Sequence, residues 1–270
     1  MDLQLSGRKA LVTGASNGIG AATARFLAQE GVAVAVHGRN PDRTAAVAAE
    51  IVDLGQRAVT VIGDLAEEGV VDRVADTVLK ELGPVDILIC NAGGRGPLSP
   101  VGWEESSLEN WRATFEMNVH YSVRLIQRLA PAMREKGYGR IVLVSSAAGL
   151  QPMGNQPDYG AAKAALTNLA VSTSKWLRGS GVTVNAVSPG ATMTDQLRRY
   201  LTRVARDKGW GDDWTEIERR AANEMMKIPA GCFGQPEQVA SLIAWLASPW
   251  ASFMTGANLH MDGGVVGTMT

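Results

Sequence analysis

Six short apolar runs, most of them rich in β-branched residues, alternate along the chain with longer stretches that have helical periodicity. The runs span residues 10–12, 32–36, 58–62, 85–90, 141–144 and 182–187. Most are apolar throughout, which is typical of parallel strands that helices cover on both faces. The alternation therefore predicts an α/β fold, a doubly wound parallel sheet of about seven strands with helices on both faces.

No internal repeat interrupts this alternation, so we predict a single domain over residues 1–270. Residues 191–234 depart from the pattern as a polar, helical insert that carries Trp210, Trp214, Met225 and Met226. Because ligands bind beyond the carboxyl ends of the strands in such sheets, a long excursion there with large apolar side chains fits a substrate lid. A surface helix pair that packs on the body is the alternative.

Charge and composition exclude several classes of function. The 26 basic and 27 acidic residues give a net charge of −1, so nothing favours nucleic acid or an anionic membrane as a partner. Cys90 and Cys232 lie far apart, and His37, His120 and His260 are scattered, so we expect neither a disulfide nor a metal site. Residues 1–9 lack the apolar core that a signal peptide would have, and no apolar stretch is long enough for a membrane span, so we expect a cytoplasmic protein.

A glycine-rich run joins the first predicted strand to a helix-forming stretch. It reads Thr13-Gly14-Ala15-Ser16-Asn17-Gly18-Ile19-Gly20. Gly14 permits a tight turn, Gly18 lets backbone N–H groups approach a pyrophosphate at the helix N-terminus, and Gly20 allows close packing of helix and strand. The spacing G-x-x-x-G-x-G is not the commonest fingerprint, but its strand–turn–helix context predicts a dinucleotide site formed by Gly14, Ser16, Asn17, Gly18, Ile19 and Gly20.

The end of the second predicted strand favours NADP(H) over NAD(H). An acidic side chain at this place accepts hydrogen bonds from the adenosine ribose, whereas Arg accommodates a 2′-phosphate. The strand ends in Val36-His37-Gly38-Arg39-Asn40, without a carboxylate. We therefore expect Arg39 and Asn40 to contact the cofactor, with the Arg39 guanidinium on the phosphate. In the alternative interpretation Arg39 is a solvated loop residue.

Polar segments also follow the next two predicted strands. Asp64 and Leu65 come after the third strand, where the Asp64 carboxylate is placed to accept from the adenine amino group. Asn91, Ala92 and Gly93 follow the fourth. Each segment alone is compatible with a simple turn. Because neighbouring strand ends line one crevice, we expect both to contact the dinucleotide.

A tyrosine and a lysine, Tyr159 and Lys163, are four residues apart and share one face of a predicted helix. An ammonium close to a phenol favours the phenolate, so we expect Lys163 to lower the pKa of Tyr159 and to make Tyr159 an acid/base near neutral pH. Ser146, at the end of the fifth predicted strand, is placed to hydrogen-bond the reacting oxygen. A Tyr–Lys pair alone is usually a surface pair, but its combination with Ser146 predicts a catalytic site.

These motifs together resemble the short-chain dehydrogenase/reductase family over essentially the whole chain. The matching segments occur in family order: residues 13–20, Asp64, residues 91–93, Asn118, Ser146, Tyr159, Lys163, Pro189, Gly190, Thr194 and residues 262–264. The resemblance implies a Rossmann-type fold in which Tyr159 exchanges the proton, Ser146 stabilises the oxygen and Lys163 binds the nicotinamide ribose.

The resemblance also implies roles that the residues alone do not indicate. Asn118 would help to hold a water that links Lys163 to solvent. Residues Pro189, Gly190, Thr192 and Thr194 would contact the nicotinamide side of the cofactor. Family members are usually homotetramers, or homodimers, built here from helices around residues 106–136 and 157–178.

One departure from the family pattern concerns the cofactor. Many NADP-binding relatives carry a basic residue just before the second motif glycine, where this chain has Asn17. Arg39 would therefore have to neutralise most of the charge of the 2′-phosphate.

The leading functional hypothesis is an oxidoreductase that moves hydride between NADP(H) and a carbonyl or secondary alcohol. The segment between Ser146 and Tyr159 is mostly apolar and, with Trp210 and Trp214 of the insert, indicates a medium-sized, largely apolar small-molecule substrate.

Two alternatives remain open. The first is a 3-oxoacyl-(acyl-carrier-protein) reductase, although Gly137 and Ser180 stand where such reductases present Arg to an acidic carrier. The second is a non-catalytic dinucleotide-binding sensor or scaffold, which a fold alone does not exclude. The intact set of Ser146, Tyr159 and Lys163 argues for turnover.

Overall fold

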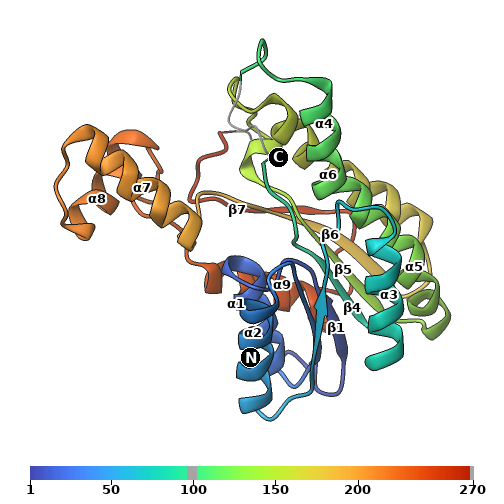
Figure 1. Ribbon diagram of the computed structural model, residues 1–270. Helices are drawn as coiled ribbons and strands as arrows, with labels where there is room; N and C mark the ends of the chain where they lie inside the picture. Colours follow the sequence, from blue (N-terminus) through green and yellow to red (C-terminus); the bar gives the residue numbers. More distant parts are fainter. Residues whose placement is uncertain (96–101, 268–270) are drawn as a thin grey trace.

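Seven parallel strands form one sheet in this computed structural model, which describes residues 1–95 and 102–267 (Figure 1). The order across the sheet is β3-β2-β1-β4-β5-β6-β7. The strands are β1 (Lys9–Val12), β2 (Ala33–Gly38), β3 (Ala58–Ile62), β4 (Ile87–Cys90), β5 (Gly139–Val144), β6 (Val182–Pro189) and β7 (Asn258–Met261). The order reverses between β1 and β4, and a doubly wound sheet binds its ligand at such a switch point. The predicted fold class is confirmed.

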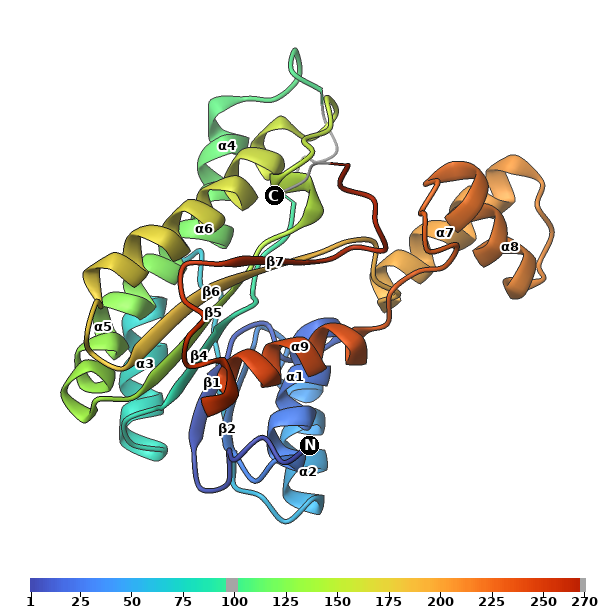
Figure 2. The same cartoon turned by 180° about the vertical axis from the view of Figure 1, so that it is seen from behind.

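Helices cover both faces of the sheet. On one face lie α1 (Gly18–Gln29), α2 (Pro41–Asp53) and α9 (Pro236–Ala247), and on the other lie α3 (Val70–Glu81), α5 (Tyr121–Lys136) and α6 (Pro157–Trp176) (Figure 2). The short helix α4 (Leu108–Phe115) packs against α6 and continues into α5 through a π-helical turn, Glu116–His120. No helix among the described residues is long and apolar enough to cross a membrane.

The apolar strands bury side chains on both faces, which explains why they show no alternation with polar residues. In β1, Leu11 belongs to the core beneath α3, α5 and α6, whereas Ala10 and Val12 belong to the core beneath α1, α2 and α9. All three side chains are fully buried. Two cores on opposite faces therefore fix the sheet and hold its carboxyl edge, where the predicted site residues lie.

Residues 191–234 form a helical insert with a core of its own. It contains α7 (Asp195–Lys208), α8 (Trp214–Arg220) and a π-helical turn, Ala221–Met225. Leu201, Ile217 and Phe233 are buried within it. Both ribbon views show α7 and α8 projecting away from the sheet (Figures 1 and 2).

The two tryptophans of the insert pack on this internal core. Trp210 and Trp214 are partly buried against it, and the Arg198 guanidinium lies 4.0 Å from the centroid of the Trp214 ring. These contacts help to hold the insert together, because two short helices need large side chains to bury enough apolar surface. The expectation that the same rings help to enclose a substrate stays a prediction.

Two paired segments connect the insert to the sheet. The Met193 N–H donates to the Gly234 carbonyl over 2.8 Å, and the Gly234 N–H donates to the Ala191 carbonyl over 3.1 Å. These bonds fix both ends of the insert beside the carboxyl end of β6.

Candidate active site

The glycine-rich turn lies between β1 and α1, at the switch point of the sheet. Gly14 and Gly18 have φ values of +64° and +53°, which favour glycine. A Cβ on Gly20 would lie 2.3 Å from the Gly14 carbonyl oxygen and 2.4 Å from Nδ2 of Asn91. Asn91 itself donates from Nδ2 to the carbonyl oxygens of Thr13 and Gly14, at 2.9 and 3.1 Å. The end of β4 thus holds the shape of the turn.

A hollow of about 410 Å³ opens at these strand ends. Most of the predicted dinucleotide residues line it: Gly14, Ser16, Asn17, Gly18, Ile19, Arg39, Asn40, Asp64, Leu65, Asn91, Ala92, Gly93 and Thr194. Among the described residues, no group of three or more His, Cys, Asp or Glu side chains could hold a metal ion.

Other predicted cofactor residues lie outside the lining of this hollow. They are Gly20, Tyr159, Lys163, Pro189, Gly190 and Thr192. A Cβ on Gly190 would lie 2.6 Å from the Cα of Asp262, and Thr192 is buried where it pairs with Gly234. In the structure Gly190 therefore allows β6 and the segment after β7 to pack closely.

The hollow has the chemistry of a phosphate site. Asn17, the residue before α1, makes no side-chain hydrogen bond to the first turn of α1 in the described structure. The N–H groups of that turn therefore stay available to an anion at the positive end of the helix dipole. Basic side chains line the same space, so the residues present fit the phosphate groups of a dinucleotide.

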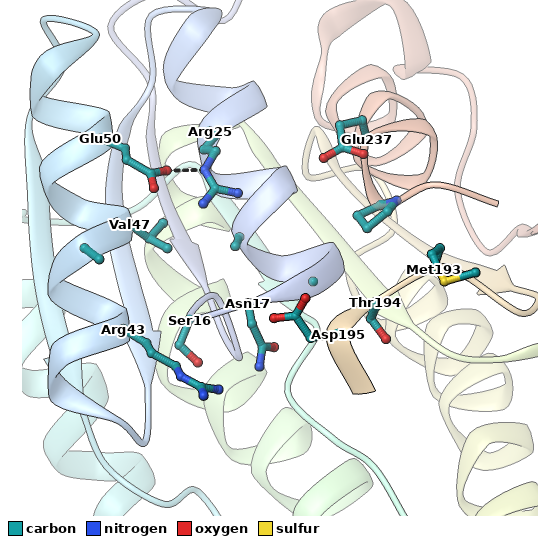
Figure 3. A pocket seen from close by; sticks show the side chains of 14 residues that line it. Ser16, Asn17, Arg25, Arg43, Val47, Glu50, Met193, Thr194, Asp195 and Glu237 are labelled. Atoms are coloured by element: carbon teal, nitrogen blue, oxygen red, sulfur yellow. Dashed lines mark hydrogen bonds and ion pairs between the residues drawn. The ribbon is translucent and has the colours of Figure 1, made fainter. Parts of the chain in front are cut away.

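Sequence reasoning missed several residues of this lining, including Arg43, Met117, Gln196 and Arg199. Arg43 also lines a second hollow of about 400 Å³. Figure 3 shows Arg43 gathered with Ser16, Asn17 and Asp195 at one end of that space, while the Arg25–Glu50 ion pair lies at the other. Arg43 stands in the first turn of α2, only a few residues after the segment 36–40 from which the cofactor preference was inferred. Its closeness in sequence to Arg39 is the signal that could have identified it.

His37 ties the glycine-rich turn to two strands. Its Nδ1 accepts from the Gly14 N–H at 3.3 Å, so Nε2 carries the proton and donates to the Gly63 carbonyl at 3.1 Å. Burial lowers the pKa of His37 to about 4. His37 is therefore neutral at physiological pH and adds no positive charge to the hollow.

Arg39 lies at the mouth of the hollow in an ion pair with Asp64. The Nη1–Oδ2 distance is 3.1 Å, and 68% of the Arg39 side chain remains exposed. Asp64 also accepts from the Ala66 N–H at 3.1 Å. The carboxylate that was predicted to meet the adenine thus holds the Arg39 guanidinium beside the end of β2.

Tyr159 and Lys163 lie on the first two turns of α6 and face the end of β5. The Lys163 ammonium is buried, donates to the Val144 carbonyl over 3.0 Å and lies 5.7 Å from the centroid of the Tyr159 ring. The Ser145 hydroxyl donates to the Lys163 carbonyl over 2.7 Å, which ties α6 to the strand.

Ser146 lies two residues after the last residue of β5. Its Oγ accepts from the Ala148 N–H at 3.1 Å, which leaves the hydroxyl proton available to another acceptor. The Ser146 hydroxyl lies beside Tyr159 and acts to lower the pKa of that phenol. The structure therefore brings together the three side chains that the sequence predicted as a catalytic set.

The expected effect of Lys163 on Tyr159 was wrong. Burial raises the pKa of Tyr159 above its usual value, and the opposing contributions of Ser146 and of the Arg95 charge do not reverse the shift. The loss of phenol hydration dominates, while the Lys163 ammonium is directed to the Val144 carbonyl. Burial also lowers the pKa of Lys163 to about 8.

Asn118 is fully buried in the π-helical turn between α4 and α5. Its Oδ1 accepts from the Gly94 N–H at 3.1 Å, and its Nδ2 donates to the Gly94 and Thr114 carbonyls at 2.8 and 2.7 Å. A Cβ on Gly93 would lie 2.5 Å from this Oδ1 and 3.3 Å from the Lys163 ammonium. Asn118, Gly93 and Lys163 therefore meet at one point.

A buried carboxylate next to Tyr159 also went unnoticed in the sequence. Asp158 accepts at Oδ2 from Nδ2 of Asn110 at 2.8 Å and from the Thr114 hydroxyl at 2.6 Å. Because the Thr114 carbonyl accepts from Asn118, hydrogen bonds connect the start of α6 to Asn118 through α4. From sequence, an acidic residue in a first helical turn is explained by the helix dipole alone.

A family model described as short chain dehydrogenase matches residues 8–204 of this chain. The match covers the glycine-rich turn, the hollow and the Tyr159–Lys163 pair. The chain belongs to the short-chain dehydrogenase/reductase family. As a member of this family it is an NAD(P)-dependent oxidoreductase that acts on CH–OH or C=O groups.

Named relatives resemble the chain over nearly its whole length. A cis-4-hydroxycyclohexanecarboxylate dehydrogenase of Sinomonas cyclohexanicum is 36% identical, covering 95% of this chain and 96% of its own. A 3-oxoacyl-[acyl-carrier-protein] reductase of Synechocystis is 34% identical, covering 97% and 98%. The crystal structure of L-sorbose reductase from Gluconobacter frateurii, complexed with NADPH and L-sorbose, superimposes with a TM-score of 0.93 at 32% identity and full coverage of both chains.

Proposed function

We propose that this enzyme moves hydride between NADP(H) and a carbonyl or secondary alcohol, and that Tyr159 exchanges the proton of the reacting oxygen. The observation that carries the proposal is the convergence of Ser146, Tyr159 and Lys163 beside Gly93, at the edge of the hollow. Bound NADP(H) supplies or accepts the hydride. The protein has to position the oxygen and to move one proton.

Each side chain of the site has one task in this proposal. The free hydroxyl proton of Ser146 bonds the substrate oxygen and holds it against the phenol. Tyr159 donates its proton as the oxygen gains charge, and its raised pKa keeps it protonated at neutral pH. The Lys163 ammonium binds the ribose hydroxyls, and Asn118 holds a water that connects Lys163 to solvent.

NADP(H) is our proposal for the cofactor. Arg39 and Arg43 both line the hollow at the end of β2, and Asp64 directs the Arg39 guanidinium there. Their charges suit a 2′-phosphate. The NADPH complex of the sorbose reductase supports this choice.

Arg39→Ala tests the cofactor proposal. We expect kcat/KM for NADPH to fall by about tenfold or more, because the phosphate loses a guanidinium and meets an unpaired Asp64 carboxylate. The value for NADH should stay within about twofold. Initial rates with both cofactors measure the ratio, and Arg134→Ala, an exposed change on α5, is the control. Equal preference in the wild type, or an unchanged ratio in the variant, would sink the proposal.

The pH dependence of reduction should report Lys163. Its pKa of about 8 means that the ammonium is present below that pH and is lost above it, while Tyr159 stays protonated to a higher pH. We expect kcat/KM for a carbonyl to be level below about pH 8 and to fall by up to tenfold per unit above it. Rates measured on both sides of this pH check the fall in kcat/KM, and Lys163→Met is the comparison. A level profile through about pH 10 would contradict it.

For the substrate we propose a medium-sized, largely apolar carbonyl compound. The segment between Ser146 and Tyr159 supplies apolar side chains, among them Leu150, Pro152 and Met153. We further propose that the helical insert acts as a lid over this segment. A panel of carbonyls and alcohols, followed through NADPH absorbance, identifies the class, and turnover only of polar or charged compounds would refute the apolar assignment.

The similarity to the Synechocystis reductase supports the alternative that this enzyme reduces 3-oxoacyl groups on an acyl carrier protein. The lack of basic residues at positions 137 and 180 opposes this alternative. Positions 137 and 180 lie near one another, since a Cβ on Gly181 would lie 2.1 Å from the Gly137 carbonyl oxygen. Neither position is basic. In the same panel, turnover of a carrier-bound but not a free β-keto ester would establish this alternative.

We propose a homotetramer for the assembled enzyme. Exposed apolar side chains support it: Val171 and Trp176 on α6, and Trp250 and Phe253 shortly before the edge strand β7. Light scattering should give about four times the chain mass of 28.6 kDa, and the mass of a single chain would refute it.

A further inference from the structure

Asp158 carries a buried carboxylate without a counter-charge. The residue is fully buried, and its Oδ2 accepts only from neutral groups, the Asn110 amide and the Thr114 hydroxyl. Its Oδ1 has no hydrogen-bond partner, and no cation pairs with the carboxylate within residues 1–95 and 102–267. Burial of a charge in such surroundings costs free energy, and an oxygen without a partner adds to the cost. Stability alone therefore does not explain an acidic residue at this position.

The first turn of α6 carries Tyr159 and lacks an ordinary cap. Gln156, the residue before the helix, makes no side-chain hydrogen bond to this turn in the described structure. A helix end without a cap frays, so the position of Tyr159 depends on other contacts. Asp158 supplies one of them. Consecutive residues of a helix point about 100° apart, so Asp158 faces α4 while Tyr159 faces the end of β5.

Two sets of hydrogen bonds hold this end of α6, one from each neighbouring element. On the side of β5, Lys163 is tied to the strand end through both its ammonium and its carbonyl. On the side of α4, Asp158 is tied to Asn110 and Thr114. Tyr159 lies between the two sets, one residue after Asp158 and four before Lys163. The contacts with β5 alone would leave the first turn free to rotate about them, and the contacts with α4 remove this freedom.

Thr114 connects the two segments that carry the site. Its hydroxyl donates to Asp158 over 2.6 Å, and its carbonyl accepts from Nδ2 of Asn118 at 2.7 Å. Asn118 in turn meets the Lys163 ammonium at Gly93. The hydrogen bonds of one residue of α4 thus set the start of α6 against the π-helical turn.

We propose that Asp158 is a positioning residue, which through Thr114 fixes the phenol of Tyr159 against the substrate oxygen. The inference rests on the proposed function, because it requires Tyr159 to exchange the proton. Asp158 acts through the helix and exchanges no proton itself. This role explains why a carboxyl group is kept here at a cost in free energy: one of its oxygens holds two residues of α4 at once.

Thr114→Val and Thr114→Ser test this role at the partner of Asp158. Valine keeps the shape of the side chain and the carbonyl that holds Asn118, but it removes the hydroxyl, which serine retains. We expect Thr114→Val to lower kcat by about tenfold, because small displacements of a reacting group are costly, while KM for the carbonyl and Kd for NADPH stay within about twofold. Thr114→Ser should keep kcat within about threefold, as should Asp158→Asn, whose amide oxygen can still accept both hydrogen bonds.

The solvent isotope effect supplies a readout that a loss of stability does not move. With Tyr159 displaced, transfer of its proton becomes slow relative to transfer of hydride. The ratio of kcat in ordinary water to kcat in heavy water should therefore rise in Thr114→Val and stay at the wild-type value in Thr114→Ser. Ser248→Ala is the control for stability. It removes a buried hydroxyl with two hydrogen bonds at the end of α9, on the opposite face of the sheet from α6, and should leave kcat and the ratio unchanged.

The possible outcomes separate the inference from the proposed function. If Tyr159→Phe turns over as the wild type does, both fail. If Tyr159→Phe loses its activity but Thr114→Val keeps its kcat and its solvent isotope effect, only the inference fails. A loss in Thr114→Ser as large as that in Thr114→Val would assign the effect to packing and overturn the role of the hydroxyl. Weaker NADPH binding in Thr114→Val, or an equal loss of kcat in Ser248→Ala, would show general disruption and also overturn it.

Discussion

Replacement of Tyr159 by Phe is expected to lower kcat by about 10²–10⁴-fold while the Kd for NADPH stays within about twofold of the wild type. The change removes the phenol oxygen and keeps the ring, so the packing at the start of α6 is retained. Without that oxygen the substrate oxygen has no proton donor beside it, because Ser146 is far too weak an acid and the Lys163 ammonium is directed to the Val144 carbonyl. Steady-state rates and NADPH titration measure the two quantities separately.

Tyr200→Phe is the matched control for this loss. Tyr200 lies half-exposed on α7 and outside the lining of the hollow, and the same hydroxyl is removed there. We expect its kcat to be unchanged. Activity above about a tenth of the wild-type value in Tyr159→Phe would show that Tyr159 is not the acid/base.

Gly20→Ala is expected to weaken NADPH binding by about a hundredfold, because a small displacement of the glycine-rich turn misplaces its N–H groups. The new Cβ would lie 2.3 Å from the Gly14 carbonyl oxygen and 2.4 Å from Nδ2 of Asn91. Neither neighbour can retreat without moving the turn or breaking the Asn91 hydrogen bonds. Titration of NADPH measures the loss, and thermal unfolding records the accompanying strain.

Gly55→Ala separates the strain from the binding. Gly55 has a φ of +80° and open space around it, so alanine there costs about 1 kcal/mol of unfolding free energy without touching the hollow. We expect it to be destabilised and to bind NADPH normally. If Gly20→Ala binds NADPH as the wild type does, the turn does not shape the cofactor site as described.

The fold was predictable because its strands are buried on both faces. The six apolar runs correspond to β1 to β6, and the helices between them needed no further assumption. The strand β7, Asn258–Met261, was not located, because it is short, half-buried and includes two polar residues. A short edge strand of this kind shows no recognisable pattern of apolar residues in the sequence. Its position is determined by its pairing with β6.

Site residues that belong to one continuous motif could be predicted from the sequence. Site residues that meet only when distant segments pack together could not. The turn at residues 13–20 and the Tyr159–Lys163 pair each form a local motif. Arg199 reaches the hollow only because the insert folds back to the turn, and Asp158 reaches Thr114 only through the packing of α4 on α6. The pKa direction of Tyr159 was missed for a similar reason, since burial is a property of the whole fold.

Transfer of deuterium tests the central claim most directly. The wild type is incubated with NADPH deuterated at both C4 positions and with the best carbonyl of the panel, in ordinary water, and the alcohol is examined by mass spectrometry. We predict one deuterium on the carbinol carbon of each product molecule. The alcohol oxygen should carry ordinary hydrogen, because its proton comes from Tyr159 and not from the cofactor. An alcohol without deuterium, or NADPH consumption without an alcohol product, would contradict hydride transfer to a carbonyl at this site.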